Sequence, residues 1–327
     1  MLATRFTGLV GCDIPFQQAP MGAVTTPALV AAVANAGGVG MLPLQAMPPQ
    51  IVSATLDDIA QRTSGVFGVT FLMPFFDRDC LDVAVQKARI IDFYYGDPDP
   101  ALIDVVHSGG AIASWQVGSV REGRAAADAG CDFIIVQGIE AGGRVRGQVA
   151  LFPLLTGVLD EVDVPVVAAG GLGSPRSVAA AFAAGADAVR IGTRLNASEE
   201  SAAHPAYKQA LINAEPQDTV LTDEFSVMWP NGPEPHRVLR SSLEAARAFQ
   251  GDTVGQMQIG PETLEVPRLS VVCPNTHTTG EVEAMALYAG QSVGAVRQVQ
   301  PATEIIDELM SGAERLLSVH HQKAPAA

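Results

Sequence analysis

The stretch IIVQGIEAGGRVRG places polar side chains in a glycine-rich turn immediately after an apolar run. The run is typical of a buried strand and stops at Gln137. The turn that follows carries one acid, Glu140, and two arginines, Arg144 and Arg146. Ligands of α/β proteins bind at the carboxyl ends of parallel strands. The turn is therefore a candidate for ligand contact.

Two more glycine-containing turns follow predicted strands further along the chain. Gly170 and Gly171 end one apolar run and precede Ser174, which begins a helix, and Gly192 and Thr193 end the next run. No Cβ obstructs the N–H groups of such turns, and the dipole of a following helix favours an anion. Barrels commonly bind phosphate after their last two strands. Each turn alone is an ordinary βα connection, but the pair predicts a phosphate site.

The elements that position these turns alternate regularly from residue 15 to residue 213. Uniformly apolar runs indicate strands buried on both faces, as in a parallel sheet. Eight strands are predicted, over residues 16–19, 39–42, 66–72, 90–93, 111–114, 133–136, 166–169 and 188–191. Ala-rich amphipathic runs predict eight helices, over residues 26–36, 49–61, 81–88, 100–107, 120–129, 152–162, 175–184 and 198–214.

Some helix boundaries carry their own signals. Thr26 and Ser174 each precede a proline, which is the order of an N-cap and the first helical position. A left-handed C-cap is predicted at the glycines that follow four of the helices, Gly37, Gly109, Gly130 and Gly185.

Strict alternation of strands and helices predicts a closed (β/α)8 TIM barrel, with an open doubly wound sheet as the alternative. The rhythm breaks from about residue 215 to residue 287, where the chain contains WPNGPEPHR and two further prolines. A last helix is predicted over residues 303–318. The expected domains are a barrel made of residues 1–214 and 288–327, and an inserted smaller subdomain or lid made of residues 215–287.

Composition narrows the class of protein. The chain has 327 residues, 48% of them hydrophobic, which is enough for one barrel-sized core. Its formal net charge of −15 argues against binding to nucleic acid or an anionic membrane. The four cysteines form no CxxC pair, so neither a disulfide framework nor a zinc site is expected. Without a signal-like N-terminus or an apolar stretch of ~20 residues, a cytoplasmic protein is expected.

Four motifs resemble the nitronate monooxygenase family, formerly called 2-nitropropane dioxygenases. They are QAPMGAVTTPALVAAVANAGGVGML, VQGIEAGGRVRG, PVVAAGGLGSPRSVAAAFAAGADAVRIGTRLNASEESAAHPAYK and, near the C-terminus, YAGQSVG. The similarity covers most of residues 15–213 and the segment 288–294. FMN-dependent enoyl-ACP reductases and quinone reductases share several of these motifs, which therefore indicate the superfamily more specifically than the reaction.

The resemblance implies a β/α barrel that holds FMN non-covalently. The implied phosphate contacts agree with the site predicted from the glycine turns. By motif, the cofactor contacts are Ala19, Pro20 and Met21 at the isoalloxazine ring, Gln137 and Gly142 elsewhere on the flavin, Gly170, Gly171, Gly192 and Thr193 at the phosphate, and Tyr288, Gln291, Ser292 and Gly294 in a closing C-terminal segment.

Two residues depart from the family pattern. The usual Asn after the third strand is Thr70, whose hydroxyl is expected to donate to the flavin ring. The His of the family's EAGGH motif, which acts as a general base, is Arg144. Guanidinium does not accept a proton near pH 7, but it can pair with a carboxylate or a nitronate. A preference for an already anionic substrate is expected, and a surface-loop arginine is the alternative. Arg146 is expected to be a bystander.

Residues after the fourth strand offer a second catalytic candidate. Asp92, Tyr94 and Tyr95 lie in IIDFYYGDP, and Tyr94 is chosen to face the substrate. A packed aromatic turn is the alternative.

The histidines carry less weight. His204 is expected to have a structural role, such as bonding a nearby carbonyl, and His107 suits a helix C-terminus. His236 and His277 lie in the irregular region, from which either side chain could reach the flavin face.

The first functional hypothesis is an FMN-dependent oxidoreductase that oxidises alkyl nitronates with O2. The second is an FMN enzyme that uses NAD(P)H to reduce an enone, a quinone or an enoyl-acyl substrate, although no GxGxxG turn is present for the nicotinamide cofactor. The third is a flavin-binding barrel without activity, and a flavin-free barrel for a sugar phosphate is disfavoured by YAGQSVG. A homodimer is compatible with all of them.

Overall fold

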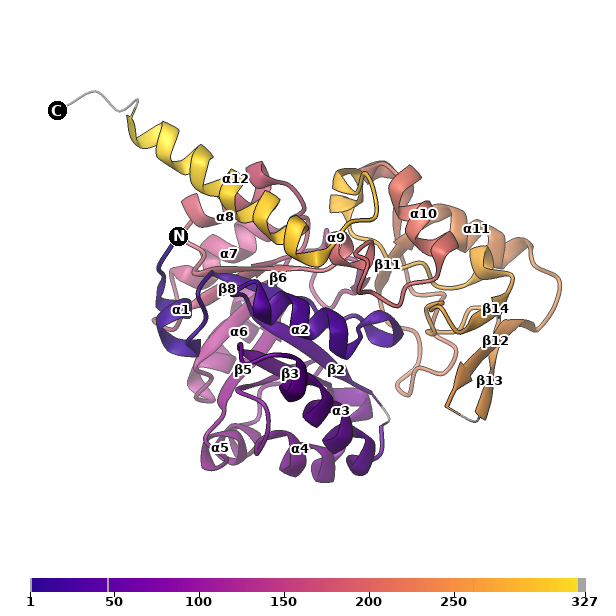
Figure 1. Cartoon of the computed structure of the whole chain (residues 1–327), viewed down its shortest axis with the longest axis horizontal. Helices are drawn as coiled ribbons and strands as arrows, with labels where there is room; N and C mark the ends of the chain where they lie inside the picture. The colour runs from indigo at the N-terminus through magenta and orange to yellow at the C-terminus, as the bar shows by residue number, and fades with distance from the viewer. Residues whose placement is uncertain (1, 46, 261, 323–327) are drawn as a thin grey trace.

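The chain folds around a barrel of eight parallel strands (Figure 1). The computed structural model describes residues 2–45, 47–260 and 262–322, with only the backbone of residues 319–322. The strands pair in the order β1-β9-β8-β6-β5-β4-β3-β2, and a parallel bridge between Gln17 and Val39 joins the two ends. The predicted TIM barrel is confirmed. Its strands are β1 (Phe16–Gln18), β2 (Gly40–Leu44), β3 (Phe67–Leu72), β4 (Ile90–Tyr94), β5 (Ile112–Val117), β6 (Phe133–Gln137), β8 (Val166–Ala169) and β9 (Ala188–Ile191).

Helices surround the barrel and cover its outer face. The predicted N-caps are present, since the hydroxyls of Thr26 and Ser174 accept hydrogen bonds from Leu29 N and Ser177 N. The helices of this layer are α2 (Pro27–Asn35), α3 (Pro49–Arg62), α4 (Arg78–Ala84), α5 (Pro100–Ser108), α6 (Val120–Asp128), α7 (Leu151–Leu159), α8 (Pro175–Ala183) and the C-terminal α12 (Ala302–Gln322). The short α9 (Thr193–Asn196) follows β9, and α10 (Pro205–Asn213) lies away from the barrel, beside the inserted region (Figure 1). Short 3-10 turns are η1 (Gly22–Val24), η2 (Met73–Phe75), η3 (Pro216–Asp218), η4 (Val282–Ala284) and η5 (Gln291–Ala295).

Two local predictions are wrong. The helix predicted over 198–214 is shorter and begins later, as α10, because His204 is its N-cap and Pro205 its first residue; the short α9 precedes the predicted range. The left-handed residue after α5 is Gly110, with φ of +79°, and not Gly109, whose φ is −79°.

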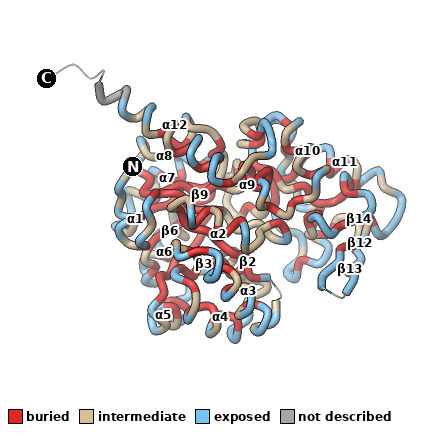
Figure 2. The backbone as a smooth tube through the Cα atoms, viewed as in Figure 1, coloured by how far each residue is buried: buried red, intermediate tan, exposed pale blue. Residues whose placement is uncertain are grey.

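A short helix that the sequence analysis did not predict, α1 (Arg5–Val10), contributes to the core inside the barrel. Phe6 and Val10 are buried with side chains from inside the barrel, and the Phe6 ring packs edge-on against Phe133 at 5.2 Å. Figure 2 shows buried backbone running through the barrel strands and exposed segments on the outer helices. No described helix is long and apolar enough to cross a membrane.

The region from residue 215 to residue 287 is more regular than expected. The loop after β6 contributes a short strand, β7 (Gly143–Arg144), to a sheet of this region in the order β10-β11-β7. Figure 1 shows the region on one side of the barrel. Its other elements are β10 (Thr219–Thr222), β11 (His236–Leu239), α11 (Arg240–Ala248), β12 (Thr253–Ile259), β13 (Glu262–Pro267) and β14 (Thr278–Gly280).

Candidate functional site

The turns after β8 and β9 leave backbone donors unpaired at the mouth of the barrel. Gly170 and Gly171 have φ of +96° and +71°, a backbone that other residues adopt only with strain. Gly171 and Gly192 are partly exposed, although the strands that lead to them are buried, and their N–H groups have no acceptor within the described part of the chain. These donors fit the phosphate of a flavin mononucleotide.

The C-terminal segment 288–294 lies against the turn after β6 and the turn after β9. Gly290 N donates to the hydroxyl of Thr193 at 3.0 Å, and Gln291 N donates to the carbonyl of Glu140 at 2.9 Å. A Cβ on Gly142 would lie 2.4 Å from Gly290 N, so the two backbones require glycine to approach. Predicted cofactor residues from distant parts of the sequence therefore lie side by side.

The end of β1 completes this side of the mouth. Ala19 N donates to the carbonyl of Ile191 at 2.8 Å, which holds the Ala19–Pro20–Met21 stretch beside the β9 turn. A Cβ on Gly192 would lie 3.2 Å from the Ala19 Cβ and 3.7 Å from the Met21 sulfur. The predicted ring contacts thus lie next to the predicted phosphate contacts.

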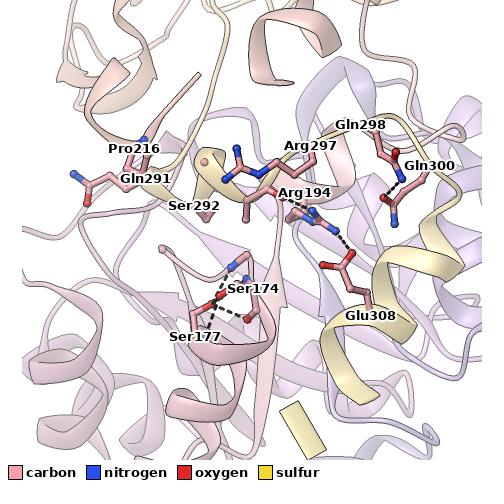
Figure 3. A pocket seen from close by; sticks show the side chains of 14 residues that line it. Ser174, Ser177, Arg194, Pro216, Gln291, Ser292, Arg297, Gln298, Gln300 and Glu308 are labelled. Carbon is pink, nitrogen blue, oxygen red and sulfur yellow. Dashed lines mark hydrogen bonds and ion pairs between the residues drawn. The ribbon is translucent and has the colours of Figure 1, made fainter. Parts of the chain in front are cut away.

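A cavity of about 690 Å³ opens beside these turns (Figure 3). Gly171, Gln291, Ser292 and Gly294, all predicted cofactor residues, line it. The cavity then continues outward between α8, η5 and α12.

Inside the barrel the structure shows a buried ion pair that the sequence analysis did not predict. Arg190 Nη2 lies 2.9 Å from the Asp92 carboxylate, and neither side chain is more than 1% exposed. Arg190 also donates to the side-chain oxygens of Gln17 and Gln116, at 2.8 Å each. Because strand residues alternate between faces, Arg190 lies on the same face as Gly192, two positions below it. A charged layer therefore lies under the predicted cofactor site.

Thr70 belongs to this layer. Its hydroxyl donates to Asp92 at 2.9 Å, and Ser114 donates to the same carboxylate at 3.2 Å. Burial raises the pKa of Asp92, and these donors and Arg190 oppose the effect. Since a hydroxyl has one proton, the expected donation from Thr70 to the flavin ring is replaced by donation to Asp92.

Gln137 and Tyr94 fix the glycine-rich turn that follows β6. The Tyr94 hydroxyl lies 2.6 Å from the Gln137 side-chain oxygen and 3.0 Å from the Arg144 carbonyl. It also accepts from Arg146 N at 3.1 Å, and Gln137 Nε2 donates to the Arg144 carbonyl. Burial raises the pKa of Tyr94. This geometry gives Tyr94 a positioning role, and direct contact with substrate stays a prediction.

Arg144 is anchored to the inserted region. Its Nη1 donates to the carbonyl of Glu234 at 2.8 Å, its Nη2 donates to the carbonyl of Phe225 at 3.0 Å, and its guanidinium lies 4.0 Å from the Trp229 ring centroid. Such a cation–π contact holds the side chain over the indole. Nη1 also lies 3.0 Å from Nδ1 of His236. Carbonyls, an imidazole and an indole thus surround this cation, and none of them is a carboxylate.

His236 lies directly beside Arg144 in the pairing of β7 with β11. Its Nε2 accepts from Phe225 N at 3.2 Å, and its Nδ1 lies 2.8 Å from the carbonyl of Glu234 and 3.0 Å from Nη1 of Arg144. Burial and the charge of Arg144 lower its pKa to about 4. The buried ring is therefore neutral near pH 7.

The other charged residues of the turn have structural partners. Both carboxylate oxygens of Glu140 accept from Leu151 N, at 3.1 and 3.0 Å, at the start of α7. Arg146 pairs with Glu122 and Asp97, at 2.7 Å each. This arrangement agrees with the expected bystander role of Arg146.

An aromatic cluster joins the inserted region to the ends of β3 and β4. Trp229 packs edge-on against Phe75 and Tyr95, at 5.4 Å in each case, and Tyr95 packs against Tyr94 at 5.0 Å. Tyr95 has φ of +71°, which is unusual for an aromatic residue. The loop around Trp229 thus contacts the barrel at its mouth.

Three histidines lie in other surroundings. His204 accepts from Ala206 N at 3.1 Å as the cap of α10, so its partner is an amide and not the expected carbonyl. His107 lies 2.9 Å from Asp132, and His277 is exposed in the turn before β14.

Comparison with known proteins places this geometry in a family. The family model described as nitronate monooxygenase matches residues 3–80 and 55–312. A "(3aS,4S,5R,7aS)-5-hydroxy-7a-methyl-1-oxo-octahydro-1H-indene-4-carboxyl-CoA dehydrogenase" of Rhodococcus jostii is 34% identical over 78% of this chain and 70% of its own length. The structure of FabK from Thermotoga maritima is similar with a TM-score of 0.80 and 28% identity, over 98% of this chain and 99% of FabK. A nitroalkane oxidase from Streptomyces ansochromogenes is similar with a TM-score of 0.79 and 27% identity, over 97% and 100% of the chains. The chain belongs to the nitronate monooxygenase family of flavin-dependent oxidoreductases.

Proposed function

We propose that the protein binds FMN and oxidises an alkyl nitronate with O2. The observation that carries the proposal is the fixed guanidinium of Arg144 at the position where the family motif has His. Arg144 is held by the carbonyls of Glu234 and Phe225 and by Trp229. A positively charged group at this place favours a substrate that is already an anion and provides no base for a neutral one.

FMN, when bound, supplies the two-electron redox chemistry, while the protein supplies position and electrostatics. The unpaired amides of Gly171 and Gly192 would hold its phosphate. Gln137 and Tyr94 keep the Arg144 backbone in place through hydrogen bonds to its carbonyl. The positive charge of Arg144 would attract and orient the nitronate oxygens. The buried Arg190–Asp92 pair fixes the layer beneath.

A second candidate, reduction of an enone, a quinone or an enoyl-acyl substrate with NAD(P)H, is favoured by an apolar cavity. This cavity of about 370 Å³ lies at the ends of β2 and β3 and is lined mainly by Leu44, Met47, Phe71, Phe75 and Phe76. A small nitronate does not need such a volume. The 34%-identical relative is named as a CoA dehydrogenase, which agrees with a bulky apolar substrate.

An anaerobic absorbance titration tests the first candidate against the second. The purified protein is expected to show a flavin band near ~450 nm that bleaches on addition of an alkyl nitronate. A band that ignores nitronate and bleaches with NADH or NADPH would replace the first candidate by the second. A flavin band that responds to neither nitronate nor NAD(P)H would support the third hypothesis, a flavin-binding barrel without activity.

A further inference from the structure

The cavity of Figure 3 extends well beyond the turns assigned to the flavin phosphate. Its outer part is lined by polar and charged side chains that no cofactor assignment uses, among them Arg194, Arg297, Gln298, Gln300 and Glu308. The whole cavity measures about 690 Å³, within the ~300–1,000 Å³ of small-molecule sites. Among the described residues, no aromatic or large aliphatic side chain lines it, so it does not suit an acyl chain.

Arg194 is a buried cation with incomplete bonding. The residue is 5% exposed and lines the cavity. Its Nη1 donates to the carbonyl of Ala295 and its Nη2 lies 2.6 Å from Glu308, but its Nε has no acceptor among the described residues. The Glu308 side chain is 46% exposed, so this carboxylate is held from one side only. An anion entering the cavity competes directly with Glu308 for Arg194.

A second cation at the cavity is nearly free. The Arg297 side chain is 68% exposed, and its Nη1 is 3.8 Å from the Glu215 carboxylate, too far for a hydrogen bond. The N-terminus of the nine-residue helix α8, capped by Ser174, also faces the cavity and adds a partial positive charge. Two arginines and a helix N-terminus therefore line the cavity beside one carboxylate, that of Glu308, in a chain whose net charge is −15.

We propose that this outer cavity binds the diphosphate of a nucleotide tail on the substrate or reductant, of the kind that CoA thioesters and nicotinamide dinucleotides carry. Arginine and helix N-termini are the usual partners of phosphate, and the glutamines offer donors and acceptors to the rest of a polar tail. Without phosphate, the Glu308 carboxylate pairs with the Arg194 guanidinium, and a bound phosphate would take the place of this carboxylate. The inference rests on the second candidate of the proposed function, because an acyl-CoA or a nicotinamide dinucleotide carries such a tail and an alkyl nitronate does not. It assigns the flavin phosphate to the inner turns and the second phosphate group to the outer cavity.

Calorimetric titration of the flavin-loaded protein with ADP tests the proposal without turnover. ADP is expected to bind, and more weakly as salt is added. Arg297→Ala is expected to raise the Kd for ADP at least about tenfold, because a charge-assisted pair is lost. Glu308→Gln is expected to lower the Kd, because the competing carboxylate is removed. Arg124→Ala, at a similarly exposed arginine paired with Glu161 on the protein surface, is the control and should leave the Kd unchanged.

Free CoA and NADPH, used as competitors, identify the source of the diphosphate. Displacement of ADP by CoA alone assigns the tail to a thioester substrate, and displacement by NADPH alone assigns it to the reductant. No binding of ADP to the flavin-loaded protein, with binding only after the flavin is removed, would show that the cavity is the outer end of the cofactor site. A Glu308→Gln variant that binds ADP no better than the parent would make the Arg194–Glu308 pair structural only. Failure of the flavin to respond to any substrate would count against the proposed function and not against this site.

Discussion

The two sides of the barrel mouth differ in how their polar groups are bonded. On the side of β8 and β9, the amides of Gly171 and Gly192 have no acceptor among the described residues, and a large cavity adjoins them. On the side of β4 and β6, the Tyr94 hydroxyl and the Gln137 side chain are bonded within the chain, and so is much of the Arg144 guanidinium. Unpaired donors are costly unless a ligand or water satisfies them. The first side is therefore built to receive a ligand, and the second to hold the inserted region in place.

The largest effect is expected where the open side loses a glycine. Gly171→Ala forces a side chain into a backbone with φ of +71° and a Cβ 3.2 Å from that of Glu140. Shifting the turn displaces the amides, so the Kd for FMN should rise on the order of a hundredfold, which corresponds to about 3 kcal/mol of strain and lost contact. Fluorescence titration of the apoprotein with FMN measures this.

Gly11→Ala is the matched control for that substitution. Gly11 has φ of +83° with open space around it and lies at the end of α1. The Gly11→Ala substitution should introduce similar backbone strain and leave the Kd for FMN unchanged. Equal weakening in both variants would mean that the β8 turn has no special place in cofactor binding.

On the bonded side, His236 predicts a pH dependence of stability. Its pKa is lowered from 6.5 to about 4, so the unfolded chain binds this proton more tightly than the folded chain. The contribution of His236 to the free energy of unfolding is complete above about pH 6.5. It is lost as the pH falls toward 4, which lowers the free energy of unfolding by about 3 kcal/mol. Urea unfolding across this range measures it. The His236→Gln variant should show a shallower slope, and a slope equal to that of the parent would remove His236 as its source.

Tyr94→Phe should lower stability with a smaller effect on flavin. The variant loses the hydroxyl that joins Gln137, the Arg144 carbonyl and Arg146 N. Leaving buried groups unpaired should reduce the free energy of unfolding by roughly 1–3 kcal/mol while FMN stays bound. Thermal unfolding and the flavin spectrum of one preparation report both quantities. Loss of turnover with full stability and bound FMN would instead make Tyr94 a catalytic residue.

The smallest effect is expected from Arg144→Ala, measured as KM for an alkyl nitronate. Loss of the guanidinium charge should raise the KM for the nitronate by about tenfold. FMN should stay bound, since the glycine turns after β8 and β9 do not contact the Arg144 side chain. Arg144→His should improve turnover of neutral nitroalkanes by restoring a base. An unchanged KM in Arg144→Ala would remove this side chain from the substrate site and leave it as an anchor for the inserted region.

The sequence predicts the barrel well because its strands are buried on both faces. Every barrel strand lies within a few residues of its predicted range, and Thr26 and Ser174 cap the helices they were expected to cap. The prediction of an irregular inserted region is wrong for two reasons. It missed a local hairpin of β12 and β13, and another part of the pairing is non-local. β11 forms a sheet with β7, which lies in a different part of the sequence, and apolar periodicity does not reveal such a partner.

Within the site, sequence motifs brought the correct segments together but did not reveal the bonding of the side chains. Nothing local indicated that Arg144 points to carbonyls of residues 225 and 234, or that Thr70 donates to Asp92. One signal was present: Asp92 and Arg190 each interrupt an apolar strand. A single charge in such a run costs several kcal/mol unless a partner compensates it, so the two could have been paired.

The close contact between Gly142 and Gly290 has a consequence for biosynthesis. One wall of the flavin site is made early in translation, and the segment that closes it is made only after the whole inserted region. At roughly 5–20 residues per second, the interval between the two glycines is on the order of ten seconds. The last two barrel strands, β8 and β9, are made within this interval, and the mouth stays open on one side until residues 288–294 follow. In the proposed site, flavin that arrives in this interval would meet an open half-site, which residues 288–294 would then enclose.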